Sequence, residues 1–168
     1  MARSCLTCNI STNWRNNVTS ESGIVVAPGE GQVLRAFGEE VTILLTGEQT
    51  GGRLTMWLET TPPGGGPPLH FHINDDETFH VLEGRVAFFH GGAWHEVGPG
   101  GTAFVPRGQL HAFKNVGEEK SRMLLSTAPA GFDVFITRCA EEFAKPAVDM
   151  GRVMEISAEH GIHFVDRN

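Results

Sequence analysis

Short apolar runs separated by turn residues make up most of this chain. The clearest run covers residues 53–60, where Leu54, Met56 and Leu58 alternate with more polar positions. A period of two predicts a β-strand with one buried face. We therefore expect Met56 and Leu58 to face the core, and Trp57, in the opposite phase, to lie on the outer face.

Other runs of the same kind predict many more strands, each bounded by glycine, proline or acidic turn residues. The expected strands cover residues 23–28, 32–37, 41–46, 69–73, 78–82, 85–90, 93–97, 102–105, 111–116, 122–127 and 132–137. Such a series is typical of a sandwich, jelly roll or barrel. Residues 138–145 and 149–160 instead have helical spacing, and Gly161 is a plausible stop. The expected organisation is an arm over 1–22, an all-β barrel over 23–137 and a helical extension over 138–168.

Composition and charge argue against several classes of partner. The 168 residues are 40% hydrophobic, which is enough for one domain with a core. The net charge is −7 and Lys and Arg form no cluster, so nucleic acid and anionic membranes are not expected partners. No run of about 18 apolar residues predicts a membrane span. The polar start of the chain does not resemble a signal peptide.

The three cysteines suggest a reducing compartment. Cys5 and Cys8 form a C-x-x-C pair, but only the distant Cys139 could add another thiol ligand. A structural zinc site uses about four ligands, so we interpret the pair as thiols in a polar arm. An odd cysteine count without an export signal predicts a cytoplasmic protein.

Candidate chemistry lies in a group of histidines with one carboxylate. His70 and His72 are two residues apart, so a strand would point both imidazoles to one side. Glu77 opens the next predicted strand and His111 opens a later one. Each residue alone would more often be an ordinary surface or hydrogen-bonded side chain. Together they suit one divalent transition metal ion, namely Fe, Mn, Ni, Co, Cu or Zn, with coordination positions left open for a substrate or dioxygen.

The surrounding glycines and prolines complete two known motifs. Residues 64–84 fit the first motif, G-x5-H-x-H-x4-E-x6-G, and residues 100–115 fit the second, G-x5-P-x-G-x2-H-x3-N. The matching residues are Gly64, His70, His72, Glu77 and Gly84, then Gly100, Pro106, Gly108, His111 and Asn115. In both blocks the chain resembles the cupin superfamily. The resemblance implies a double-stranded β-helix (a jelly-roll barrel) with short C-terminal helices here, and a metal held by His70, His72, Glu77 and His111.

A looser resemblance concerns residues 69–84, 131–133 and 158–162, which are similar to small single-domain bacterial cupins of the quercetin-dioxygenase-like group. It implies an oxidoreductase of the dioxygenase type, acting on a small organic, flavonol-like or otherwise aromatic or enolic molecule. Glu77 would then be both metal ligand and catalytic base. The resemblance to cupins in general also implies a homodimer, in which an outward Trp57 would suit a subunit contact. Two alternatives remain: a lyase or isomerase that uses the ion as a Lewis acid, and a non-catalytic small-molecule-binding cupin.

Strand alternation also predicts a pocket beside the metal. Phe79 shares the phase of Glu77, and Phe113 shares that of His111. With Met56, Leu58 and Phe88 they would form an apolar chamber for the small-molecule ligand. The competing interpretation is that these five side chains are ordinary barrel core.

Overall fold

The computed structural model describes residues 23–165. The arm predicted over 1–22, including Cys5 and Cys8, lies outside the described residues, as do residues 166–168. The elements are strands β1 (Gln32–Ala36), β2 (Glu39–Leu45), β3 (Thr55–Thr61), β4 (His70–His72), β5 (Asp76–Glu83), β6 (Val86–His90), β7 (Ala93–Val97), β8 (Thr102–Val105), β9 (Ala112–Asn115), β10 (Ser121–Ala128) and β11 (Ile162–Phe164), and helices α1 (Phe132–Phe143) and α2 (Met150–Glu159).

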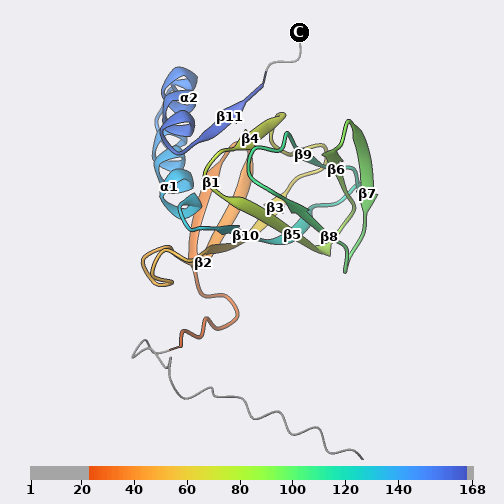
Figure 1. Ribbon diagram of the computed structural model, residues 1–168, viewed down its shortest axis with the longest axis horizontal. Helices are drawn as coiled ribbons and strands as arrows, with labels where there is room; N and C mark the ends of the chain where they lie inside the picture. The colour runs from red at the N-terminus through yellow and green to blue at the C-terminus, as the bar shows by residue number, and fades with distance from the viewer. Residues whose placement is uncertain (1–22, 166–168) are drawn as a thin grey trace, which may run out of the picture.

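Antiparallel sheets build the barrel. The largest has the strand order β1-β2-β3-β10-β5-β8, and two smaller sheets pair β11 with β4 and arrange β7-β6-β9. The helices lie at the β1 side of the barrel, and β6 and β7 lie at the opposite side (Figure 1). The predicted class, an all-β jelly-roll barrel with short C-terminal helices, is confirmed. Within residues 23–165, no helix combines the length and the apolar character that a membrane crossing requires.

Strand β3 buries the face opposite to the one predicted from its alternation of apolar and polar residues. Trp57 and Glu59 are buried, whereas Met56 and Leu58 are only half-buried on the other face. The indole stacks on Phe132 with ring centroids 3.9 Å apart, and its Nε1 donates a hydrogen bond to Glu59 Oε2 at 3.0 Å. A buried indole needs such an acceptor, and Glu59 supplies it from the same face. The predicted outer position of Trp57 is therefore wrong, and this side chain cannot form a subunit contact. The homodimer itself stays a prediction.

The two ends of the barrel also differ from expectation. Residues 23–28 form no strand, and Val25 is 92% exposed. The strand predicted over 132–137 is wrong because α1 begins at Phe132, so the boundary at 137/138 falls inside a helix. Asp133, in the first turn, accepts hydrogen bonds from Thr55 Oγ1 and from the Gly47 amide. A carboxylate at this end of a helix is favourable, and these bonds attach α1 to the barrel.

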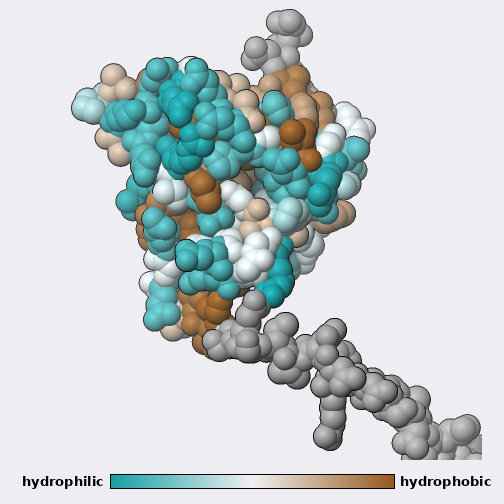
Figure 2. Space-filling view, turned by 60° about the vertical axis from the view of Figure 1, so that its left-hand side comes forward, coloured by the Kyte–Doolittle hydropathy of each residue, from teal (hydrophilic) through white to brown (hydrophobic). Residues whose placement is uncertain are grey.

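Strand β11 was not predicted. It follows Gly161 and pairs with β4, placing Ile162 opposite His72 and Phe164 opposite His70. The chain thus returns after two helices to cover one edge of the strand that carries two candidate ligands. The outer surface over the helical side is mixed, with apolar patches separated by hydrophilic residues (Figure 2).

The orientation of β3 can be tested with two tryptophans in different environments. Trp57 is fully buried and Trp94 is 47% exposed. Trp57→Ala should lower the free energy of unfolding by about 3–5 kcal/mol, because it removes buried contacts and leaves a cavity. Trp94→Ala should cost about 1 kcal/mol or less. Urea denaturation measures both, and equal losses would contradict the inward orientation of Trp57.

Candidate metal centre

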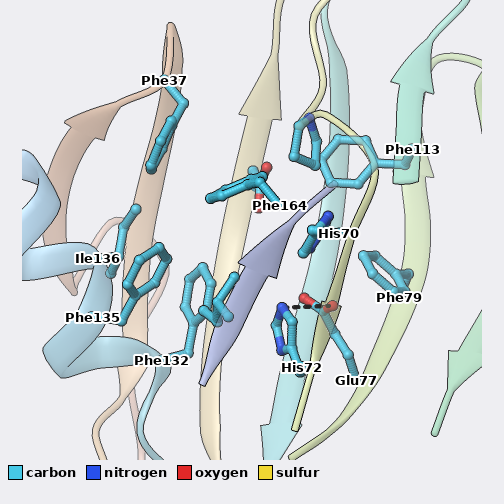
Figure 3. A pocket seen from close by; sticks show the side chains of 13 residues that line it. Phe37, His70, His72, Glu77, Phe79, Phe113, Phe132, Phe135, Ile136 and Phe164 are labelled. Atoms are coloured by element: carbon cyan, nitrogen blue, oxygen red, sulfur yellow. Dashed lines mark ion pairs between the residues drawn. The ribbon is translucent and has the colours of Figure 1, made fainter. Parts of the chain in front are cut away.

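Three histidines and one glutamate from separate parts of the sequence meet inside the barrel. His70 and His72 lie on β4, Glu77 lies on β5, and His111 directly precedes β9. All four are buried, and one ligand atom from each lies within 4.8 Å of the others. Figure 3 shows His70, His72 and Glu77 converging at one end of an apolar cavity. The structure therefore brings together every residue that the motifs predicted as a ligand.

Backbone hydrogen bonds fix this convergence. The amide of His70 donates to the carbonyl of His111 at 2.9 Å, and the amide of His111 donates back at 2.8 Å. The Gly108 amide donates to the carbonyl of His72 at 2.6 Å. Gly66 allows the loop before β4 to approach, since a Cβ on it would lie 2.1 Å from the Phe113 carbonyl oxygen. Backbone contacts thus hold the motif glycine Gly108 and the motif histidines together.

Each imidazole is oriented through Nδ1. His70 Nδ1 lies 2.9 Å from the Pro68 carbonyl oxygen, and His111 Nδ1 lies 2.9 Å from that of Gln109. His72 Nδ1 lies 2.8 Å from Asp75 Oδ1. Acceptors at Nδ1 fix the tautomer that leaves Nε2 available, which is the usual support for histidine ligands. The donor set and its orientation fit a divalent transition metal ion, whose identity they do not define.

The four side chains strongly influence one another's charge. Burial, followed by the charges of His111 and His72, lowers the pKa of His70 from 6.5 to about 3. Burial also acts against charge on His72, but Glu77 and Asp75 outweigh it and raise the pKa of His72. Burial raises the pKa of Glu77, yet the surrounding histidines outweigh it and lower that pKa. His111 Nε2 and Glu77 Oε2 are 3.0 Å apart. A bound ion would replace the proton between them.

An apolar cavity lies against the cluster. Its water-accessible volume is about 50 Å³. Phe79 and Phe113 line it as predicted, but Met56, Leu58 and Phe88 do not. Met56 and Leu58 are excluded because β3 turns its other face inward, and Phe88 packs behind Phe79 in the core with ring centroids 5.2 Å apart. The remaining walls come from elements that the sequence did not assign to the pocket, with Phe37, Phe132, Phe135, Ile136, Ile162 and Phe164 among them.

Glu59 is the polar lining residue that sequence reasoning missed. It is 4% exposed and lines the same cavity as His70, His72 and Glu77. Burial, and then the charge of nearby Glu39, raise the pKa of Glu59 well above its usual 4.5. The carboxyl group is therefore neutral where an exposed glutamate would be ionised. The sequence does show that Glu59 and Trp57 lie on the same face of this strand. Placing Trp57 in the core would therefore have placed Glu59 there as well.

Comparisons with known proteins agree with this geometry. Residues 57–127 match the family model for the Cupin domain. The chain is 24% identical to quercetin 2,3-dioxygenase of Bacillus subtilis over 119 residues, which are 71% of this chain and 35% of that protein. It is 29% identical to polyketide synthase CurC of Streptomyces cyaneus over 96 residues, which are 56% of this chain and 62% of that protein. The chain thus spans about a third and about three fifths of these relatives' lengths.

The fold is also shared with solved structures. The crystal structure of a predicted oxalate decarboxylase from Thermotoga maritima superposes with a TM-score of 0.60 at 23% sequence identity. The match covers 63% of this chain and 99% of that one. At this identity the similarity establishes a common barrel and leaves the reaction open.

The support of His72 by Asp75 gives a test of the candidate centre. Asp75→Asn removes the carboxylate that orients the ring, and metal affinity should fall by about 10–100-fold. Competition against a chromogenic chelator with Co²⁺ or Zn²⁺ measures this. Glu96→Gln, on the exposed strand β7, is the matched loss of one surface carboxylate and should bind like the wild type. Unchanged affinity in Asp75→Asn would contradict a metal centre at His72.

The buried Glu59 carboxyl predicts a pH dependence of stability. In the unfolded chain this group titrates near 4.5, whereas its folded pKa is raised. Its contribution is therefore fully present below pH 4.5 and is lost as the pH rises through the folded pKa. Glu59→Gln should flatten the fall in Tm above pH 4.5, as measured by circular dichroism. Glu40→Gln, with its exposed carboxylate, should keep the wild-type slope. Identical slopes in all three proteins would refute the assignment.

Proposed function

Because this chain carries a cupin domain and has the fold of the cupin superfamily, we propose that it is a metal-dependent oxidoreductase of the dioxygenase type that acts on a small enolic substrate. The carrying observation is the buried cluster of His70, His72, Glu77 and His111, of which the first three line an apolar cavity. The distant similarity to quercetin 2,3-dioxygenase supports the same class of reaction.

The size of the cavity defines the substrate class more narrowly than that similarity does. Pockets for drug-sized ligands have volumes of roughly 300–1,000 Å³, whereas this cavity has about 50 Å³. A three-ring flavonol would require several phenylalanine side chains to move. A small enol or 1,3-dicarbonyl compound places its oxygens at the ligand cluster with much less rearrangement. We therefore propose a substrate of this smaller kind.

The residues of the chain have distinct roles in such a reaction. His70, His72, His111 and Glu77 would hold the ion. When bound, a redox-active metal supplies a Lewis acid for the substrate oxygen and electrons for dioxygen chemistry. A Glu77 carboxylate oxygen not used for coordination accepts the enol proton. The phenylalanine side chains exclude water, which strengthens electrostatic interactions within the cavity.

A second candidate function is a lyase, isomerase or cyclase that uses the ion only as a Lewis acid. Glu59 supports it, because a carboxyl group with a raised pKa in the same cavity provides a proton donor near the metal ligands. Activity with redox-silent zinc would separate this function from the dioxygenase.

Two histidine variants test the proposal directly. The wild type and the matched control His95→Ala, altered on the exposed strand β7, should contain about one metal per chain and consume oxygen with acetylacetone or a catechol. His111→Ala should lose the metal, and its activity should fall by more than about 100-fold. Elemental analysis and an oxygen electrode provide both readouts.

The outcomes distinguish the candidates. Turnover without oxygen uptake, retained with zinc, would replace the dioxygenase with the Lewis-acid enzyme. Tight binding of the diketone without turnover would identify a non-catalytic binding cupin. Equal metal content in His111→Ala and His95→Ala would refute the metal centre itself.

A further inference from the structure

Glu59 has a second buried carboxyl group beside it. Glu39 lies on β2, which pairs with β3 so that Val41 is opposite Glu59. Glu39 is two residues before Val41 on the same inward face, and is therefore a diagonal neighbour of Glu59. Both are buried, at 9% and 4% exposure. Two inward carboxyl groups on adjacent strands are costly unless they share protons.

Burial favours the protonated form of both carboxyl groups. It raises the pKa of Glu39, and together with the charge of Glu39 it raises that of Glu59 well above 4.5. Glu59 is accordingly the member of the pair that keeps its proton to higher pH. Trp57 Nε1 donates to Glu59 Oε2 at 3.0 Å, which stabilises the glutamate once it has lost its proton. Among the described residues, Glu39 Oε1 has no hydrogen-bond partner.

The two carboxyl groups line different cavities. Glu59 contributes to the wall of the cavity that contains His70, His72 and Glu77. Glu39 contributes to a second pocket with a water-accessible volume of about 490 Å³. That pocket is bordered by the exposed residues Arg35 and Lys120 and by the partly exposed Glu40, so it is in contact with solvent. The two neighbouring carboxyl groups thus lie between an apolar interior cavity and a polar pocket at the surface.

We propose that Glu39 and Glu59 form a proton relay between the surface pocket and the metal-side cavity. The Glu59 O–H bond breaks as its proton passes to an anionic oxygen or carbon of the substrate. Glu39 takes a proton from water in the surface pocket and passes it to the Glu59 carboxylate. One proton enters and one reaches the substrate, and no electrons are transferred. Glu59 is then a catalytic acid and Glu39 a positioning and proton-supplying residue.

This relay rests on the proposed function only in that a metal-bound enol reaction needs proton transfer. It applies equally to the oxidoreductase and to the Lewis-acid enzyme. Its direct test therefore uses the carboxyl groups themselves and requires no substrate. A protonated carboxyl group has a C=O stretching band in the infrared that is separate from the bands of carboxylates, and this band shifts when the proton is replaced by deuterium.

The experiment records this band near neutral pH for the full-length, metal-loaded protein after rapid mixing into D₂O. The wild type should show the band, and Glu59→Gln should lack it. Glu39→Gln should keep the band, but its deuterium shift should be about tenfold slower or more, because exchange of the Glu59 proton then requires opening of the buried site. The matched control Glu40→Gln lines the same surface pocket with an exposed carboxylate and should exchange like the wild type.

Two results would overturn the relay: a protonated-carboxyl band that persists in Glu59→Gln, or an exchange rate in Glu39→Gln equal to that of the wild type. Circular dichroism and metal content establish that each variant is folded and loaded. Where acetylacetone is turned over, Glu59→Gln should lower kcat by about 10²–10⁴-fold. Absence of turnover would count against the proposed function and leave the infrared result decisive for the relay.

Discussion

The reciprocal backbone pairing of His70 and His111 is the constraint on which the site depends. Two residues 41 positions apart exchange both amide hydrogen bonds, at 2.9 and 2.8 Å. This pairing sets the relative depth of two imidazoles, and the alternation of β4 then places His72 on the same inner face as His70. Since β4 has only three residues, it needs partners on both sides. His111 provides one, and β11 provides the other.

The dependence of the ligand cluster on backbone pairing explains why the sequence could predict that cluster. The two motifs combine backbone requirements with ligand chemistry, so their spacing predicted the ligand cluster and the all-β barrel together. The motif residue Gly84, for example, has a positive φ and lies where a Cβ would come within 2.8 Å of the Ser121 Cα. Phe79 and Phe113 line the cavity because each follows a motif ligand by two residues, and alternation over two residues places them on the ligand's face.

The prediction for β3 was wrong because hydropathy does not determine which face of a strand is buried when both faces carry apolar atoms. In β3 the half-buried Met56 and Leu58 looked like core, while the inward face combines Trp57 with Glu59. The hydrogen bond from Trp57 to Glu59 lowers the cost of burying both polar groups. The alternation of apolar and polar residues gives no sign of this bond. At residues 132–137 the apolar positions suited a strand, but Asp133 bonds to Thr55 and Gly47 from distant parts of the chain and favours a helix there.

The face of β3 that was wrongly predicted to be exposed also contributes to the chemistry of the cavity, because it carries Glu59. An apolar cavity disfavours ionised groups, so a carboxyl group inside it either binds a cation or remains protonated. Glu77 is surrounded by three histidines and has its pKa lowered, whereas Glu59 faces Trp57 and Glu39 and has its pKa raised. Two glutamates lining one small cavity thereby have pKa values shifted in opposite directions. Such a division favours Glu77 as the base and Glu59 as the acid. Reactions that remove a proton from one atom of a substrate and return it to another therefore suit this cavity, whatever ion the histidines hold.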